Sequence, residues 1–171
     1  MKILKIIVCC DKNYGIGKNG TLPWNDKNEM KIFKNKTIHK KNNCVIMGLN
    51  TYKSIPDKYL PLVDRHNCVL STTLNKKYNN KISVFNKTLE LFEFINNTNY
   101  DEYWIMGGAK IYNFFMENYI NLIYEIHISF MKNNYNCDTF FPKIDFNQFI
   151  EKDKTEYDTF IHYTFRNNTY S

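Results

Sequence analysis

The residue with the clearest chemical potential is a carboxylate at the edge of an apolar helix face. The pattern from about residue 25 to Thr37 predicts a helix, in which Glu29 is followed by Met30 and Phe33 at the apolar positions. A carboxylate there is costly unless a hydrogen-bonding group meets it. Glu29 also stands three residues after Asp26, which is the spacing of an N-cap and its capping-box partner. Spacing alone favours that structural role over a catalytic one.

A glycine-rich loop with an apolar end precedes this helix. It contains Gly15, Gly17 and Gly20 and closes with Leu22-Pro23-Trp24. A loop that only binds phosphate has no need of large apolar side chains, whereas a flap that closes over a flat ring does. The alternative is a flexible surface loop whose Trp24 packs on the core.

A third candidate is the double glycine Gly107-Gly108, between an apolar run at 103–106 and a helix from Ala109. Glycines at such a junction let the backbone approach a ligand closely, and the free N–H groups of the helix start favour a phosphate. A tight strand-to-helix turn without a ligand is the alternative.

The charges favour small anionic ligands or, equally, a solvated surface. The net charge is +6, but the basic residues are scattered and form no run typical of a nucleic-acid-binding arm. Of the 23 basic residues only Arg65 and Arg166 are arginine. Because the guanidinium fork matches a carboxylate with two parallel hydrogen bonds, Arg65 is a candidate ligand-binding residue. Arg166, near the end of the chain, is expected on the surface.

The five cysteines are odd in number and include no C-x-x-C pair, which supports neither a disulfide framework nor a metal site. No apolar stretch has the length of a membrane span, and no signal-peptide cleavage site is evident. We therefore expect a cytoplasmic protein without a metal.

Short apolar segments alternate with helical ones, which predicts an α/β domain with a largely parallel sheet. Strands are expected at 3–10, 43–48, 67–71, 82–85, 103–106, 122–130 and 155–166, and helices at 25–37, 50–55, 88–96 and 109–118. The alternation in 155–166 indicates an antiparallel edge strand. Residues 1–171 form one domain, and ligands should bind at the carboxyl ends of its strands.

In this order along the chain, the motifs resemble those of the dihydrofolate reductase family. The matching segments are Gly15–Trp24, Asn28-Glu29-Met30, Phe33, Val45-Ile46-Met47-Gly48, Thr51, Ser54-Ile55-Pro56, Leu62, Arg65, Val69-Leu70-Ser71, Trp104–Gly108, Tyr112 and Asp138-Thr139-Phe140-Phe141-Pro142. The resemblance spans essentially the whole chain. It implies an eight-stranded, mostly parallel mixed sheet with an antiparallel C-terminal edge, flanked by four helices.

The resemblance also implies a reaction, in which a monomer reduces 7,8-dihydrofolate to tetrahydrofolate with NADPH. The catalytic positions are Glu29, Leu22, Trp24 and Ser129. Glu29 accepts two hydrogen bonds from the pterin while hydride passes from the nicotinamide C4 to the pterin C6 and a proton, from water, reaches N5. Ser129 bridges the acid and the pterin, and Trp24 holds a water.

The same resemblance implies two sets of binding residues. The substrate positions are Ile7, Val8, Cys9, Glu29, Met30, Phe33, Thr51, Ser54, Ile55, Leu62, Arg65, Met106, Tyr112 and Ser129. The cofactor positions are Cys9, Ile16, Gly17, Gly20, Thr21, Leu22, Gly48, Leu49, Asn50, Thr51, Leu70, Ser71, Thr72, Lys87, Met106, Gly107, Gly108, Ala109, Lys110, Ile111 and Tyr112. Arg65 would bind the α-carboxylate of the glutamate tail, and Gly107-Gly108 would be a cis-peptide turn.

This chain departs from the family pattern around the cofactor phosphates. Leu49 and Asn50 stand where the family usually has basic groups, and Thr72 where some members carry arginine. The preference for NADPH over NADH is therefore expected to be weaker than usual. Two other functions stay open: a reductase of the same fold acting on a pyrimidine of the riboflavin pathway, and a non-catalytic relative that binds nucleic acid. Neither needs Leu22–Trp24, Glu29 and Arg65 together.

Overall fold

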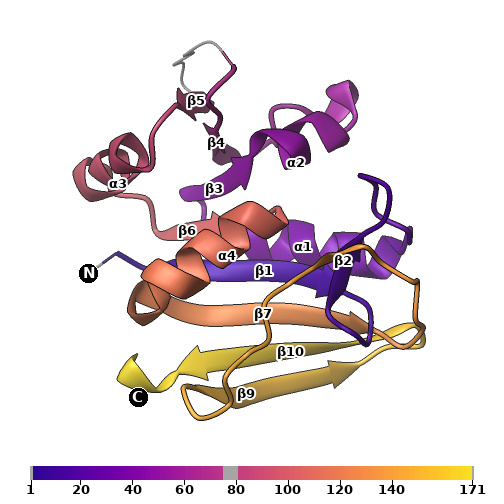
Figure 1. Cartoon of the computed structure of the whole chain (residues 1–171). Helices are drawn as coiled ribbons and strands as arrows, with labels where there is room; N and C mark the ends of the chain where they lie inside the picture. The colour runs from indigo at the N-terminus through magenta and orange to yellow at the C-terminus, as the bar shows by residue number, and fades with distance from the viewer. Residues whose placement is uncertain (1, 75–80, 171) are drawn as a thin grey trace.

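A twisted eight-stranded sheet organises the part of the chain that the structure, a computed structural model, describes: residues 2–74 and 81–170. The strand order is β5-β4-β3-β6-β1-β7-β10-β9 (Figure 1). The strands are β1 (Leu4–Cys10), β3 (Asn43–Gly48), β4 (Arg65–Leu70), β5 (Ile82–Phe85), β6 (Glu102–Ile105), β7 (Ile123–Met131), β9 (Phe149–Glu156) and β10 (Phe160–Asn167). All pairs are parallel except β7–β10 and β10–β9. The mixed sheet with an antiparallel C-terminal edge is thus confirmed.

Four α-helices in the described residues cover the two faces of this sheet. They are α1 (Lys27–Ile38), α2 (Leu49–Ser54), α3 (Thr88–Asn97) and α4 (Ala109–Asn118). Figure 1 shows α4 in front of β1 and α1 behind it. Single 3-10 turns follow at Asp57–Tyr59, Ile120–Leu122 and Asn168–Tyr170. No helix in these ranges is long and apolar enough to cross a membrane.

The central strand β1 is apolar on both sides because both sides are covered. Ile6 and Val8 pack with α3 and α4 in the larger core cluster, while Ile7 packs with Phe33 of α1 in the second cluster. Double coverage explains why this strand reads as a continuous apolar run instead of an alternating one. It also separates the side chains of β1 into two sets, of which only that of Lys5, Ile7 and Cys9 faces α1.

The C-terminal hairpin corrects one expectation. Residues 155–166 do not form a single edge strand: they contain the end of β9, a turn at 157–159 and most of β10, and the edge strand is β9. The sequence conceals β9 because every residue of it after Phe149 is exposed. A strand whose two faces both meet solvent lacks the alternation that reveals a half-buried strand.

The expected loop 11–24 also contains structure. Its residues Gly15–Gly17 form a short strand, β2, which pairs with β8 (Thr139–Phe140). A Cβ added at Gly15 would lie only 2.3 Å from the Cβ of Cys137. Close packing of the two segments therefore requires glycine at this position.

Arg166 is a second correction, since it is not a plain surface residue. Its guanidinium donates to Oε1 of Glu125 at 2.8 and 2.5 Å and lies 4.1 Å from the ring centroid of Tyr124. Lys5 binds the other oxygen of Glu125 at 3.0 Å and Glu102 at 2.8 Å. Although burial alone would raise the pKa of Glu125, hydrogen bonds from His127, Arg166 and Lys5 hold it well below its usual range.

Candidate active site

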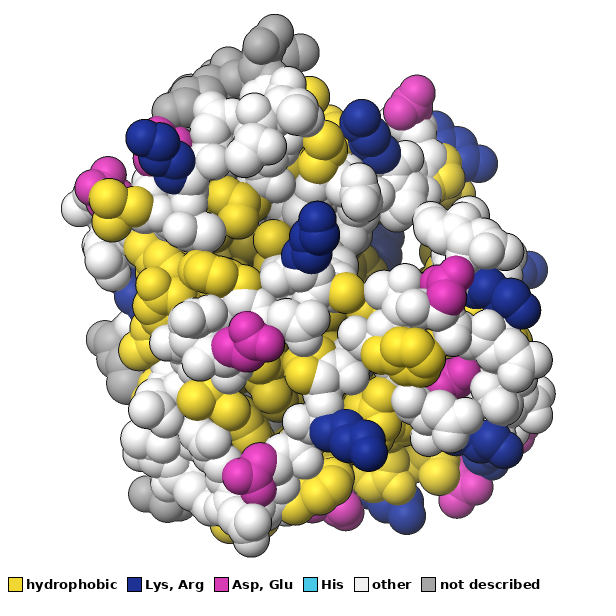
Figure 2. Space-filling view, in the orientation of Figure 1, with side chains coloured by type: hydrophobic (Ala, Val, Ile, Leu, Met, Phe, Trp, Pro, Cys, Tyr) yellow, Lys and Arg dark blue, Asp and Glu magenta, His cyan; other side chains and the backbone are white. Residues whose placement is uncertain are grey.

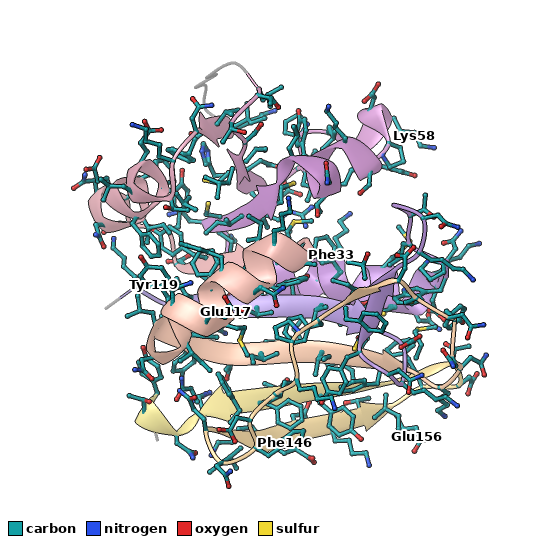
Figure 3. The ribbon with its side chains drawn as sticks, in the orientation of Figure 1. Phe33, Lys58, Glu117, Tyr119, Phe146 and Glu156 are labelled. Atoms are coloured by element: carbon teal, nitrogen blue, oxygen red, sulfur yellow. The ribbon has the colours of Figure 1, made fainter. Side chains whose placement is uncertain are left out.

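Partly exposed apolar side chains gather where β1 and β3 end. Met30 and Leu22 are 55% and 54% exposed, and Phe33, Ile55 and Leu62 are half-buried over the second core cluster. Figure 2 shows the surface notched between α2 and the loop that carries β2, and Figure 3 places Phe33 between α1 and α2. An open recess with apolar walls is what a flat aromatic ring needs.

Glu29 lies in the first turn of α1 and turns inward. Asp26 caps this helix, because one of its carboxylate oxygens accepts from the backbone N–H groups of Asn28 at 2.9 Å and of Glu29 at 3.0 Å. The Glu29 carboxylate forms no return hydrogen bond to Asp26 in the described structure, and the residue is only 8% exposed. The structural role favoured by spacing therefore falls to Asp26 alone.

The surroundings of Glu29 raise the pKa of its carboxyl group to near neutral pH. Burial raises the pKa of Glu29 to about 7; the Asp26 charge adds to this and a hydrogen bond from Ser129 opposes it. Burial, together with the charge of Glu29, also raises the pKa of the neighbouring Cys9 thiol, so that this sulfur stays protonated. A carboxyl that titrates near neutral pH beside a recess is typical of a catalytic or ligand-binding acid.

The raised pKa has a consequence for stability that can be measured. Since folded Glu29 holds its proton up to about pH 7, against 4.5 for an ordinary glutamate, its contribution to the free energy of unfolding falls as pH rises through that window, by on the order of 3 kcal/mol. Glu29→Gln stays neutral. We expect the variant to melt above the wild type at about pH 8 and near it at about pH 5. Equal pH dependence of the two melting temperatures would contradict this burial cost.

Ser129 meets Glu29 from the sheet. It lies in β7 opposite Cys9 of β1 and is 1% exposed. Its Oγ is 2.9 Å from Nδ1 of His162, the residue opposite it on β10. Sequence reasoning missed His162. The available signal was the alternation of β10, which places Phe160, His162 and Thr164 on one buried face.

The flap has a rigid end and an exposed one. Trp24 is buried against Met131 and Phe160 and meets the Tyr135 ring edge-on at 5.1 Å. Its Nε1 makes no hydrogen bond of normal geometry with the described residues, so the indole N–H can serve a water or a ligand. Leu22, two residues earlier, is open to solvent. This arrangement fits a segment that folds over a bound ring.

Arg65 is held ready for an anion. Its Nε donates to the Val63 carbonyl at 2.9 Å and its Nη1 to Thr37 Oγ1 at 2.6 Å. No carboxylate of the described residues forms an ion pair with it, and burial lowers its pKa. The guanidinium lies 5.8 Å from the ring centroid of Phe33, at the wall of the recess. Two fixed nitrogens orient a fork whose remaining N–H groups can bind a carboxylate.

The glycine pair forms the turn expected of it. The Gly107–Gly108 peptide is cis, Gly107 has φ of 114°, and the Gly107 carbonyl accepts from the N–H of Gly48 at 2.8 Å. That bond sets the starts of α2 and α4 side by side. Both helices begin at a glycine, without a side-chain cap and without an acidic residue in the first turn. The free backbone N–H groups at the start of α4 can donate to an anion.

Comparison with known proteins accords with this geometry. The dihydrofolate reductase family model matches residues 3–171. This chain belongs to the dihydrofolate reductase family. Dihydrofolate reductase of Heliothis virescens is 38% identical over 157 residues, 87% of this chain and 83% of the relative. That of Gallus gallus is 36% identical over 166 residues, 92% and 86% of the two chains. That of Schistosoma mansoni is 34% identical over 158 residues, 88% and 83%.

Other positions expected from the dihydrofolate reductase resemblance lie around the glycine turn or in the adjoining core. Tyr112 donates to the Ile7 carbonyl at 2.8 Å, and a Cβ on Gly108 would stand 3.2 Å from Thr51 Oγ1. These contacts bring β1, α2 and α4 together at the glycine turn. The side chain of Val8 packs in the core cluster on the α3 and α4 face, so its backbone is the part that can contact a ligand in the recess.

The expected phosphate-binding residues lie together at the end of β4. Asn86, next to Lys87, donates to the Ser71 carbonyl at 2.6 Å, which joins the two segments. The Ser71 hydroxyl accepts from the N–H groups of Thr73 and Leu74 at 3.2 and 3.0 Å. It is therefore committed to its own turn, and Thr72 and Lys87 are the exposed groups.

Proposed function

We propose that this protein is a dihydrofolate reductase, which reduces 7,8-dihydrofolate to 5,6,7,8-tetrahydrofolate with NADPH and so supplies one-carbon units for thymidylate and purine synthesis. The observation that carries the proposal is the buried carboxylate of Glu29, whose pKa is raised, at the edge of an apolar recess in a chain of this family. Relatives in insects, birds and flatworms bear the name of this activity.

Glu29 would hold the pterin by its amidine-like edge. An ionised carboxylate accepts two parallel hydrogen bonds from such a group, which orients the ring and polarises it. Met30, Phe33 and Ile55 would contact the ring faces, and Arg65 would bind the carboxylate of the glutamate tail. Leu22 would close over the ring and exclude water. The proton for N5 would come from water held at Trp24, not from Glu29.

The described residues fit a dinucleotide. The uncapped start of α4 suits a pyrophosphate, and the cis turn with its glycines leaves the backbone accessible beside Tyr112. When bound, NADPH supplies the hydride from its nicotinamide ring. Cys9, Met106 and Ile16 would border that ring, while Thr72 and Lys87 would face the adenosine phosphate.

Steady-state kinetics test the proposal. NADPH should be consumed only in the presence of dihydrofolate, with one NADPH oxidised for each tetrahydrofolate formed. No consumption with folded protein would overturn it. Consumption with a ribosylated aminopyrimidine instead would favour the riboflavin-pathway alternative, which no feature of the described recess supports.

Cofactor preference provides a further prediction. Because Leu49, Asn50 and Thr72 bring no positive charge to the 2′-phosphate, NADPH should be preferred over NADH only modestly. Thr72→Arg should raise the ratio of kcat/KM for NADPH to that for NADH by about tenfold, since one charge-assisted hydrogen bond contributes roughly that much. Thr72→Gln, which adds length without charge, is the matched control. An unchanged ratio in Thr72→Arg would show that residue 72 does not face the phosphate.

We also propose that the enzyme acts as a monomer in the cytoplasm and needs neither metal nor nucleic acid. No group of His, Cys, Asp and Glu side chains in residues 2–74 and 81–170 is arranged to hold a metal ion. Full activity after treatment with a chelator would support the absence of a metal requirement. A single species of about one chain mass in sedimentation would support the monomer.

A further inference from the structure

Ser129 stands between two titratable side chains, of which the proposed reaction uses only one. The Ser129 hydroxyl acts on Glu29 of α1, whose pKa it lowers, and it also meets His162 of β10, with 2.9 Å between Nδ1 and Oγ. Ser129 and His162 form a directly opposed pair in the antiparallel ladder and are 1% and 3% exposed. Their geometry is therefore fixed by the sheet.

His162 is a neutral imidazole under ordinary conditions. Burial first, and then the neighbouring His127 and Lys36, lower its pKa to about 3. The groups that face it are His127 and Ser129 of β7 and Lys36 of α1, while its partner on β9 is the uncharged Thr155. A neutral imidazole has one donor nitrogen and one acceptor nitrogen, so the question is which one carries the proton.

The lack of a partner at one ring nitrogen of His162 indicates which nitrogen carries the proton. Nε2 of His162 is buried and has no hydrogen-bond partner in the described structure. A proton on Nε2 would leave a buried N–H unpaired, which is rarer and costlier than an unpaired acceptor. The proton therefore belongs on Nδ1, where it is donated to Ser129 Oγ.

His127 does not supply the missing partner. Its Nε2 lies 3.0 Å from Oε2 of the ionised Glu125 and its Nδ1 lies 3.3 Å from Oγ1 of Thr164. Both of its nitrogens are thus occupied within the β7–β10 pair. The centroids of the two imidazole rings are 6.0 Å apart.

We propose that His162 is a positioning residue: its Nδ1–H donates to Ser129 Oγ and thereby directs the Ser129 hydroxyl hydrogen to the Glu29 carboxylate. An oxygen that accepts from His162 has its own hydrogen free for the acceptor on the other side. The arrangement stabilises the ionised carboxylate, which would bind the pterin, against the burial and the Asp26 charge around it. Its value for catalysis rests on the proposed reductase function, but the arrangement itself does not.

The first experiment reads the tautomer directly in the ligand-free wild type. The chain has four histidines, so nitrogen NMR of protein labelled at histidine is simple to assign, with His162→Asn to identify the signal. We expect a neutral ring with the proton on Nδ1 from about pH 5 to 8. A ring protonated on Nε2, or one that titrates in that range, would overturn the proposal.

The second experiment measures the pKa of Glu29 by carbon NMR of labelled glutamate, again without ligand. His162→Phe should raise that pKa by on the order of half a unit or more, and Ser129→Ala should raise it at least as much. In the Ser129→Ala background, His162→Phe should have no further effect, because His162 acts through the hydroxyl. His162→Asn, which keeps a donor near the Nδ1 position, should stay close to the wild type.

Thr164→Val is the matched control, since it removes a hydroxyl from the same buried face without touching Ser129. An unchanged Glu29 pKa in His162→Phe, or an equal shift in Thr164→Val, would contradict the proposal. If His162→Phe does not fold, the wild-type tautomer and His162→Asn still decide. Because no ligand is present, these results are independent of the reductase assay, and either proposal can fail alone.

Discussion

Glu29→Gln should lower kcat/KM for dihydrofolate by about 100-fold or more at neutral pH while the protein stays folded. The amide has the size of the carboxyl and the same place in α1, but it cannot take a negative charge or accept two hydrogen bonds from the pterin. The expected loss is measured from initial rates of NADPH oxidation between about pH 5 and 9. The NADPH dissociation constant should change little, since the glycine turn and the start of α4 are untouched.

The control for that variant is Glu117→Gln. Glu117 is exposed, and it lies at the far end of α4 from the Gly107–Gly108 turn (Figure 3). This change should leave kcat/KM unaltered. A Glu29→Gln enzyme with the full wild-type rate would show that the carboxylate is not needed, whatever its burial.

Arg65→Leu should raise the KM for dihydrofolate by about 10- to 100-fold and alter kcat much less, since a guanidinium–carboxylate pair contributes some 1.5–3 kcal/mol. Thr37 and Val63 hold the guanidinium in place, so the wild type would bind the tail without first ordering Arg65. Arg65→Lys keeps the charge but not the fork and should fall between the two.

A truncated substrate separates this role from a structural one. A dihydropterin without the glutamate tail has no carboxylate for Arg65. The wild type and Arg65→Leu should therefore bind it with similar affinity, and both should bind it more weakly than the wild type binds dihydrofolate. If Arg65→Leu loses both substrates equally, Arg65 supports the recess and does not recognise the tail.

The sequence predicts most of the fold because most elements carry a periodic apolar pattern. Residues 3–10 and 43–48 are buried on both faces and end at turns rich in glycine or charge, so their strands could be predicted within one residue. The strand β9 could not be predicted in this way. Its side chains after Phe149 are exposed to solvent, so its sequence carries no apolar pattern. The pairing of β2 with β8 joins segments more than a hundred residues apart and leaves no local signal.

The residues of the candidate site also divide into those with a local sequence signal and those that depend on contacts between distant strands. Glu29, Arg65 and the glycine pair stand out by residue type and by their neighbours, although the spacing of Glu29 from Asp26 by itself favours a helix cap. The alternation of β10 can place His162 on a buried face, but the contacts of His162 with Ser129 and of Arg166 with Glu125 could not be predicted, because these partners are 33 and 41 residues away on another strand. Cross-strand partners depend on register, and register is known only once the sheet is assembled.

One isotope experiment tests the central claim most directly. The wild-type protein is mixed with dihydrofolate and one equivalent of NADPH that carries two deuterium atoms at the nicotinamide C4, and the folate product is examined by NMR. The proposed reductase should give tetrahydrofolate with one deuterium at C6 and none at N5 in ordinary water. Product without deuterium at C6, or unchanged dihydrofolate, would contradict hydride transfer at this site.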